Sequence, residues 1–308
     1  MDETTDFTLV PKGPFSLAAS TRFLEGFAPA AYDGERVEPG AEAHLDLAFP
    51  VEGDWRTVGV RVRQADDGTV AGEVVGDADP GAVRAQVARI LSLDVDGSEF
   101  PRVAERDPVV DRLQRRYPGL RPVTFWSPYE AAAWTVIGQR IRITQAAALK
   151  ARIAEQLGEP VELHGRRLAA FPAPARLAQL DGFPGLFGRK VEWLRGVGEW
   201  ALLGRLDTTR LRSLPRERAL AELQALPGVG PFAAELILLR GAGDPDGFPA
   251  NERRVQRAMV RAYGLEAQPA PELLHAIAER WRPYRTWVSL LLRTELEDET
   301  HEITGQRR

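Results

Sequence analysis

The stretch Leu226-Pro227-Gly228-Val229-Gly230 is the clearest structural signal in this 308-residue chain. It separates a polar, helix-like segment at residues 215–225 from an almost wholly apolar one at residues 231–240. Two helices joined by a Pro-Gly-x-Gly turn form a helical hairpin. These glycines permit positive φ and leave bare N–H groups at the start of the second helix, which suit a phosphate group. A plain helix–helix corner would give the same pattern, so the stretch alone leaves its ligand open.

The segment after this hairpin brings an acidic residue close to it. Residues 241–249, with the sequence G-A-G-D-P-D-G-F-P, have turn chemistry that cannot continue a helix. Asn251 is then a suitable N-cap for a helix over residues 252–263. Glu252 would lie in the first turn of that helix. A carboxylate beside a phosphate-binding turn suits chemistry on a nucleic acid, although a glutamate in a first turn also simply complements the helix dipole.

The composition limits the class of protein. A length of 308 residues favours two domains, and 44% apolar residues are enough for sizeable cores. We find no run of about 18 apolar residues and no start typical of a signal peptide, which predicts a cytoplasmic protein. The absence of cysteine excludes disulfides, cysteine-ligated zinc and iron–sulfur clusters. The four histidines have no metal-ligand spacing.

The net charge of −4 is unevenly distributed along the chain. Residues 1–100 carry −11, residues 101–293 carry +10 and residues 294–308 carry −3. The positive segment contains the hairpin, which favours binding to a polyanion such as duplex DNA. An ordinary arginine-rich surface is the alternative interpretation.

Hydrophobic periodicity predicts an α+β fold. Strand-like alternation is followed by a helical pattern at residues 81–93, which indicates an α+β domain over residues 1–105. Helical patterns dominate afterwards, so residues 106–308 are expected to form an all-α domain with the hairpin at residues 226–230. The acidic residues 295–302 are expected to form a solvated tail. The expected strands lie at residues 7–10, 44–49, 57–64 and 69–75.

Together these stretches resemble the helix-hairpin-helix DNA glycosylase superfamily, and within it the bacterial 3-methyladenine DNA glycosylase II family. The resemblance rests on the L-P-G-V-G hairpin, the apolar helix, the G-D-P-D-x-F-P loop and the acidic residue after it. It also includes residues 118–121 (P-G-L-R), residues 127–139 with their I-G-Q ending, and residues 278–287 (A-E-R-W-R-P-Y-R-T-W). It covers about residues 7–293 and implies an antiparallel-sheet α+β domain followed by an all-α glycosylase domain that acts on double-stranded DNA.

The resemblance implies base-excision chemistry. A DNA glycosylase rotates a damaged base out of the duplex and hydrolyses its bond to the sugar. A carboxylate stabilises the positive charge that develops on the sugar, and the matching residue is Glu252. The family usually has aspartate there, so this carboxylate is carried on a longer side chain. Asp246 and Asp244 on the preceding loop are the weaker alternatives. A non-catalytic protein that binds duplexes or lesions is the alternative to an enzyme.

The resemblance also assigns residues to the DNA contacts and the base pocket. Arg140 occupies the position of the residue that fills the gap left in the duplex, or it contacts a phosphate. Two arginines in the pocket set are unexpected for a cationic alkylated base, so a lesion other than 3-methyladenine stays open. Trp134 and Trp287 also fit ordinary core positions. The DNA-binding candidates are Gly228, Val229, Gly230, Gln139, Arg140 and Arg142, and the base-pocket candidates are Phe232, Leu236, Arg253, Arg293 and Trp134.

Further expectations concern lyase chemistry, cofactors and partners. Superfamily members with lyase activity have a lysine two residues after the second glycine, where this chain has Phe232, which implies a monofunctional hydrolase. No diffusible cofactor is expected. The backbone carbonyls of Gln224, Leu226 and Val229 match positions that hold a monovalent cation in the family. We expect a monomer in the bacterial cytoplasm, associated with the nucleoid and without a membrane contact.

Overall fold

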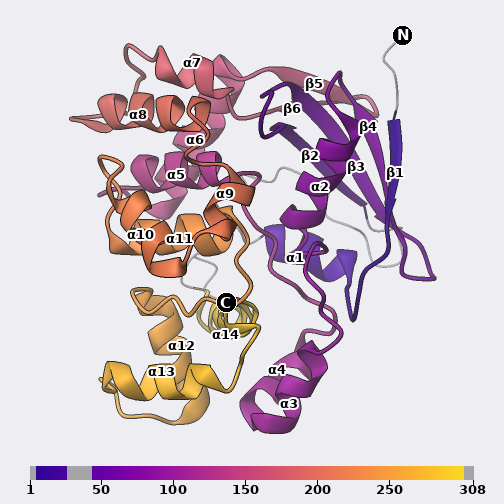
Figure 1. The fold of residues 1–308 in the computed structure, drawn as a ribbon, viewed down its shortest axis with the longest axis vertical. Helices are drawn as coiled ribbons and strands as arrows, with labels where there is room; N and C mark the ends of the chain where they lie inside the picture. The colour runs from indigo at the N-terminus through magenta and orange to yellow at the C-terminus, as the bar shows by residue number, and fades with distance from the viewer. Residues whose placement is uncertain (1–4, 26–43, 302–308) are drawn as a thin grey trace.

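The computed structural model describes residues 5–25 and 44–301 (Figure 1). The protein is mixed α/β, with a four-stranded antiparallel sheet near one end and many helices around it. The strand order is β1-β4-β3-β2, so the first strand pairs with the fourth. The strands are β1 (Thr5–Leu9), β2 (His44–Pro50), β3 (Thr57–Gln64) and β4 (Val70–Val75).

Alternating apolar residues form the buried face of this sheet. Val58, Val60 and Val62 of β3 are fully buried, and Val60 pairs with Val74 of β4. The helix α2 (Pro80–Ile90) lies against the sheet (Figure 1). The Asp79 side chain caps it by accepting the amide of Ala82 at 2.7 Å. The four expected strands and this helix are therefore present, with boundaries that shift by a few residues.

A second, two-stranded sheet lies in the part of the chain that was expected to be all helical. β5 (Pro160–Leu163) and β6 (Arg166–Ala169) form an antiparallel hairpin that packs on the first sheet. A Cβ on Gly59 of β3 would lie only 2.7 Å from the Val161 side chain, so this glycine permits the close approach. The all-α expectation is wrong here, because four-residue strands are too short to give a clear alternating pattern.

The remaining elements are helices, and several begin where the sequence predicts them. Ser127 caps the helix at residue 128 by accepting the amide of Glu130 at 3.1 Å, with proline in the first helical position. The first group comprises α1 (Leu17–Glu25), η2 (Phe100–Arg102), α3 (Val103–Arg106), α4 (Pro108–Arg116), α5 (Pro128–Ile137), α6 (Ile143–Leu157) and α7 (Pro174–Ala178). The second comprises α8 (Lys190–Leu202), α9 (Thr208–Ser213), α10 (Arg216–Gln224), α11 (Pro231–Leu236), η3 (Ile237–Gly241), α12 (Arg253–Tyr263), α13 (Pro271–Glu279) and α14 (Arg285–Thr300).

Two apolar clusters hold these elements together. The larger joins the four-stranded sheet to the helices from α5 to η3. The smaller surrounds the buried side chains of Trp281 and Trp287 and joins α4 to α12, α13 and α14. The hairpin helix α11 belongs to the larger cluster and α14 to the smaller, so the residues between these two helices lie where the clusters meet.

The expected acidic tail is wrong for the residues that the structure describes. The helix α14 continues to Thr300, and Glu295 is buried rather than solvated. Its carboxylate forms ion pairs with Arg112 and with Arg116, the latter at 3.0 Å. A run of acidic residues looked like a tail because its partners lie far away in the sequence. Glu302 lies outside the described residues.

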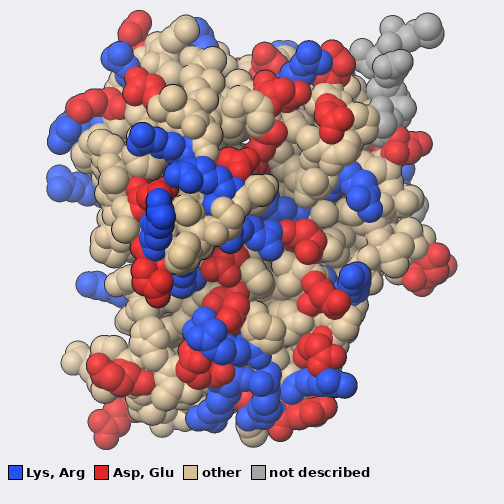
Figure 2. Space-filling view, viewed as in Figure 1, with Lys and Arg blue, Asp and Glu red and all other residues tan. Residues whose placement is uncertain are grey.

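Basic and acidic side chains are interspersed on the face shown in Figure 2. Arginines of the positive segment are paired with carboxylates: Arg210 with Glu222 at 2.6 Å and Arg216 with Asp244 at 2.9 Å. The surplus of positive charge in residues 101–293 therefore does not form a continuous basic surface on this face.

None of the helices within residues 5–25 and 44–301 combines the length and the hydropathy needed to cross a membrane.

Candidate active site

The hairpin turn connects α10 to α11 and uses its two glycines differently. The amide of Val229 donates to the Leu226 carbonyl at 3.0 Å and closes the turn. Gly228 has a φ of +89°, and a Cβ there would lie 2.8 Å from the Trp193 ring. Gly230 has a φ of −95°, and a Cβ there would meet nothing within 4 Å. Only Gly228 therefore needs positive φ, whereas Gly230 leaves the start of α11 open to a ligand.

The helix after the turn changes geometry part-way along. The α-helix α11 ends at Leu236, and a π-helical turn, η3, follows to Gly241. The amide of Ala242 donates to the carbonyl of Ile237 at 2.8 Å, five residues earlier. The single helix predicted over residues 231–240 thus contains a wide turn of a kind that is frequent at functional sites.

The loop after η3 leads to the candidate carboxylate. Glu252 is the N-cap residue of α12, and its amide donates to the Pro249 carbonyl at 3.0 Å. The prediction that Asn251 caps this helix is wrong, because the Asn251 side-chain amide donates to Glu235 of α11 at 3.0 Å. The chain is thus tied to the hairpin helix one residue before Glu252.

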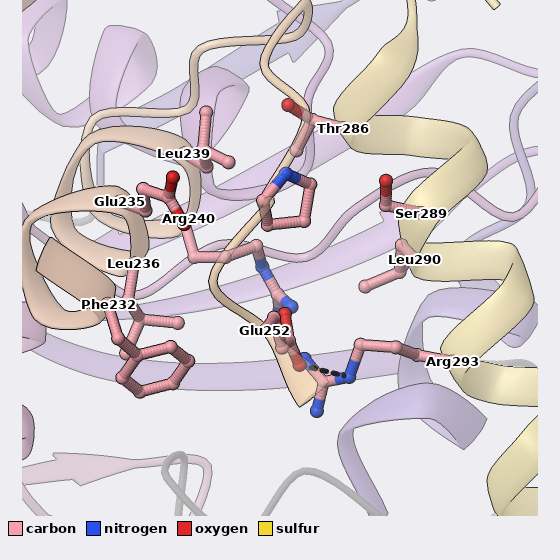
Figure 3. A pocket seen from close by; sticks show the side chains of 11 residues that line it. Phe232, Glu235, Leu236, Leu239, Arg240, Glu252, Thr286, Ser289, Leu290 and Arg293 are labelled. Atoms are coloured by element: carbon pink, nitrogen blue, oxygen red, sulfur yellow. Dashed lines mark ion pairs between the residues drawn. The ribbon is translucent and has the colours of Figure 1, made fainter. Parts of the chain in front are cut away.

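The Glu252 carboxylate is held by an ion pair to α14. Arg293 Nε lies 2.9 Å from Glu252 Oε1, with both side chains largely buried (Figure 3). Arg240 lies beside them, and burial lowers its pKa to about 9, with the neighbouring charge of Arg293 contributing. The negative charge of Glu252 acts in the opposite direction on the Arg240 pKa. Positive charge from two helices thus surrounds this carboxylate.

Glu252 lines a groove with a volume of about 1070 Å³. A small pocket of about 20 Å³ lies beside it between α11 and α14, and both spaces are lined by Phe232, Leu236, Glu252 and Arg293 (Figure 3). The groove therefore contains several of the residues that the sequence singled out. These are Trp134, Gln139, Gly228, Gly230, Phe232, Leu236, Glu252, Arg253 and Arg293.

Comparison with known proteins agrees with this arrangement. No protein-family model matches the sequence. The solved structure of a 3-methyladenine DNA-glycosylase from Archaeoglobus fulgidus has a TM-score of 0.77 and 25% sequence identity, over 96% of this chain and 99% of that one. DNA-3-methyladenine glycosylase 2 of Escherichia coli is 30% identical over 183 residues, which are 58% of this chain and 61% of that protein.

A further relative is the probable bifunctional transcriptional activator/DNA repair enzyme AlkA of Mycobacterium tuberculosis, which is 32% identical over 228 residues, or 73% of this chain. The matched region spans only 45% of that relative's length. The chain belongs to the helix-hairpin-helix DNA glycosylase superfamily. Within the superfamily it belongs to the 3-methyladenine DNA glycosylase II-like family.

Some predicted site residues of this superfamily member lie outside the groove lining. The Val229 side chain is buried in the core, so only its backbone faces the turn. Arg140 and Arg142 are exposed beyond the groove, and Arg140 has a φ of +57°. Gln139, which precedes Arg140 in the chain, connects this segment to the hairpin turn, because its Nε2 donates to the Gly228 carbonyl at 2.7 Å. Trp287 is a core residue, as its apolar surroundings in the sequence suggested.

The alternative aspartates are occupied elsewhere. Asp246 lies 2.9 Å from Arg282 and 2.9 Å from Arg285, and Asp244 pairs with Arg216. Neither aspartate lines the groove or the small pocket. These loop carboxylates thus tie the loop to α10 and to the start of α14.

Sequence reasoning missed two charged residues of the small pocket, Glu235 and Arg240. Both follow Phe232 on the hairpin helix, and both are almost fully buried. Burial raises the pKa of the Glu235 carboxyl above its usual value. Charged residues inside an otherwise apolar helix were the available signal, but the sequence does not show that this face of the helix borders a pocket.

A metal site built from side chains is not found in the described part of the chain. No group of three or more His, Asp or Glu side chains lies close enough together there to hold an ion.

Proposed function

We propose that this protein is a monofunctional DNA glycosylase of base-excision repair, which hydrolyses the N-glycosidic bond of a damaged, alkylated base after rotating it out of the duplex. The observation that carries the proposal is the position of Glu252. Its carboxylate lines the same groove as Gly230 at the open start of the hairpin helix. The names of the three relatives above support an enzyme, and none of them supports a protein that only binds DNA.

The two connected spaces suit a base and a water molecule respectively. A volume of about 1070 Å³ is ample for a rotated nucleotide, whereas about 20 Å³ has room for roughly one water. Glu252 lies at their junction. In the proposed reaction the C1′–N bond breaks, its electron pair leaves with the base, and the oxygen of water bonds to C1′. The carboxylate stabilises the positive sugar and accepts the proton that the attacking water loses as its oxygen bonds to C1′.

The charges in the groove are compatible with an alkylated base. Arg293 would repel a cationic base if it were unpaired, but its guanidinium is paired with Glu252. Arg253 is exposed at the groove and can turn toward a phosphate. Phe232 and Trp134 line the groove and offer aromatic surface to the base.

Hydrolysis without a lyase step is the second part of the proposal. The lyase position is occupied by Phe232, and a phenyl group cannot form a Schiff base. Lys150 Nζ is paired with Glu130 at 2.6 Å, and Lys190 Nζ donates to the Ile137 carbonyl at 2.8 Å. Both of these lysines are buried, so neither amine is available to an abasic sugar.

The hairpin is proposed to bind a phosphate of double-stranded DNA through the backbone N–H groups of Gly228 and Gly230, whereas the Val229 amide closes the turn that presents them. Arg140 and Arg142 would contact the strand beyond the groove. A monovalent cation at the carbonyls of Gln224, Leu226 and Val229 is proposed from the family resemblance. The Leu226 oxygen already accepts the Val229 amide, and a carbonyl has a second lone pair for an ion.

The organisation of the chain is proposed in the same terms. An α+β domain over residues 1–105 would support a helical glycosylase domain over residues 106–308. The protein is proposed to act as a monomer on chromosomal DNA in the cytoplasm, without a diffusible cofactor.

The test of this function is base release from a panel of duplexes, each with one alkylated, deaminated or oxidised base. Alkali converts an abasic site into a strand break, so released base is measured as broken strand after alkali treatment. The wild type should act on at least one alkylated base, and Glu252→Gln should not. If the wild type binds these duplexes but leaves every base in place, the protein is not a glycosylase.

A further inference from the structure

Glu235 is a buried acidic residue in the wall of the small pocket. It belongs to α11, the helix whose N-cap residue is Gly230, and only 7% of its surface is exposed. It points toward the space between α11 and α14 (Figure 3). It does not line the groove, so a base in the groove would not touch it.

Both oxygens of Glu235 bind the same residue. Oε2 accepts the backbone amide of Asn251 at 3.1 Å, and Oε1 accepts the side-chain amide of Asn251 at 3.0 Å. Asn251 precedes Glu252 in the chain and lines the groove. Two hydrogen bonds to one residue fix both its position and its orientation, which a single bond would not do.

Three contacts therefore determine where the Glu252 carboxylate lies. Arg293 holds its far end, the Pro249 carbonyl accepts its amide, and Glu235 holds the residue before it. The glutamate side chain at this position has one more rotatable bond than aspartate. Fixing its backbone is consequently more important, since misplacing a catalytic group by about 1 Å can cost about 100-fold in rate.

The face of the hairpin helix that lines the small pocket continues from α11 into the π turn η3. Glu235 and Leu236 before the turn, and Leu239 and Arg240 within it, all line the small pocket. These positions recur three and four residues apart, so one face of the helix presents Glu235 to the Asn251 loop and Arg240 to the same space.

We propose that Glu235 is a positioning residue, which clamps Asn251 and thereby places the Glu252 carboxylate for the reaction. The inference rests on the proposed glycosylase function. A carboxylate that merely filled space would be replaceable by glutamine or an apolar residue, because burial of a charge opposes stability unless its bonds are needed.

The test uses an exchange of hydrogen-bond partners. Glu235→Gln turns an NH2 group toward an amide of Asn251, so single-turnover base release should fall by about 100-fold. Asn251→Asp opposes two carboxylates and should also lose rate. In the double variant the new amide can donate to the new carboxylate, and the rate should recover to within about fivefold of wild type. Adding Glu252→Gln to the double variant should abolish release, which excludes the new carboxylate as the catalyst.

Glu52→Gln is the matched control. Glu52 is likewise a mostly buried carboxylate that accepts the backbone amide and the side-chain hydroxyl of one residue, Thr208, each at 3.1 Å. It lines neither the groove nor the small pocket. This variant should melt at a lower temperature yet release base at the wild-type rate while folded.

The outcomes separate the inference from the proposed function. If the wild type releases base and Glu235→Gln does so equally fast, or if the double variant is no faster than either single variant, Glu235 does not position Glu252. An equal loss in Glu52→Gln would mean that general destabilisation explains the effect. If the wild type releases no base at all, the glycosylase proposal fails. The clamp is then tested by amide hydrogen exchange over residues 250–253, which Glu235→Gln must accelerate if the clamp exists.

Discussion

Arg293 Nε lies 2.9 Å from Glu252 Oε1, and this ion pair connects the last helix of the protein to the start of α12. The pair places a cation behind the carboxylate that faces the groove. A carboxylate held in this way points in a fixed direction, which is what stabilisation of a positive sugar requires. The longer side chain of glutamate is thus anchored at its far end.

Replacing Glu252 tests the assignment of the carboxylate. Glu252→Gln keeps the size and removes the charge, so single-turnover base release should fall by about 100-fold or more. Duplex affinity should hold or rise, because a negative charge near phosphate is lost. Glu252→Asp withdraws the carboxylate from Arg293 by about 1.5 Å and should also slow release.

Asp246→Asn is the control for the Glu252 variants, since Asp246 pairs with Arg282 and Arg285 away from the groove. It should lower the melting temperature and leave the rate of the folded protein near wild type. Base release by Glu252→Gln at the wild-type rate would remove Glu252 from the mechanism.

Arg293→Gln should destabilise the protein as well as slow it. Removing one partner from a largely buried ion pair leaves the other charge unsatisfied, which costs about 1–3 kcal/mol. Unfolding in urea measures this loss. Glu252→Gln with Arg293→Gln removes both charges, so the double variant should lose less free energy than the two single variants added together. Strict additivity would show that the pair contributes little in solution.

The two hairpin glycines should respond differently to substitution. Gly230→Val adds a side chain in open space, so the fold should be retained while duplex binding weakens because phosphate can no longer approach. Gly228→Ala should destabilise by about 1–3 kcal/mol, since it combines a positive φ with a contact to the Trp193 ring.

Binding of the Gly230→Val protein should be measured over a range of salt concentrations. Wild-type affinity should fall steeply with salt, because phosphate contacts release counterions. A folded Gly230→Val protein that binds duplex as tightly as wild type would reduce the hairpin to a simple corner.

Local signals explain which parts of the fold could be predicted from the sequence. The hairpin follows from Pro227 and the two glycines after it, Gly228 and Gly230, and the four-stranded sheet follows from alternating apolar residues. Glu252 is identified because it follows the hairpin and the G-D-P-D-x-F-P loop at the position of the family's acidic residue. Each of these features depends on residues that are close together in the sequence.

Features that depend on distant partners could not be predicted. Arg293 was expected in the base pocket, but its pairing with Glu252 depends on how α14 packs against the loop. Glu235 has no predicted role, because only the fold brings Asn251 to it. The acidic residues near Glu295 resembled a tail, because a sequence does not show that Arg112 and Arg116 lie opposite.

Base removal should not be accompanied by strand cleavage. Phe232 replaces the lysine of lyases, and the buried amines of Lys150 and Lys190 are engaged by Glu130 and by the Ile137 carbonyl. Borohydride treatment during the reaction should therefore give no covalent protein–DNA adduct. A lyase of the same superfamily serves as the positive control, and an adduct that maps to any amine of this protein would contradict the monofunctional mechanism.

The pH dependence of base release should reveal Glu235. Burial raises the pKa of this carboxyl above 4.5, with the charge of Glu252 adding to the effect and that of Arg216 opposing it. Arg240 and Arg293 also border the pocket. As the pH falls through the raised pKa, Glu235 becomes protonated and one of its oxygens stops accepting a bond from Asn251. The rate should therefore decline at a pH above the usual range of a glutamate.

The contribution of Glu235 to the free energy of unfolding should increase as the pH falls, whereas the rate of base release declines. A carboxyl with a raised pKa in the folded state stabilises the fold most below its unfolded pKa, and this contribution is lost as the pH rises through the folded value. The difference in unfolding free energy between wild type and Glu235→Gln should therefore favour the wild type more at pH 4.5 than at pH 7. Glu235→Gln, which cannot titrate, should lack this part of the acid decline in rate. Identical pH profiles for the two proteins would show that the protonation of Glu235 has no influence on the site.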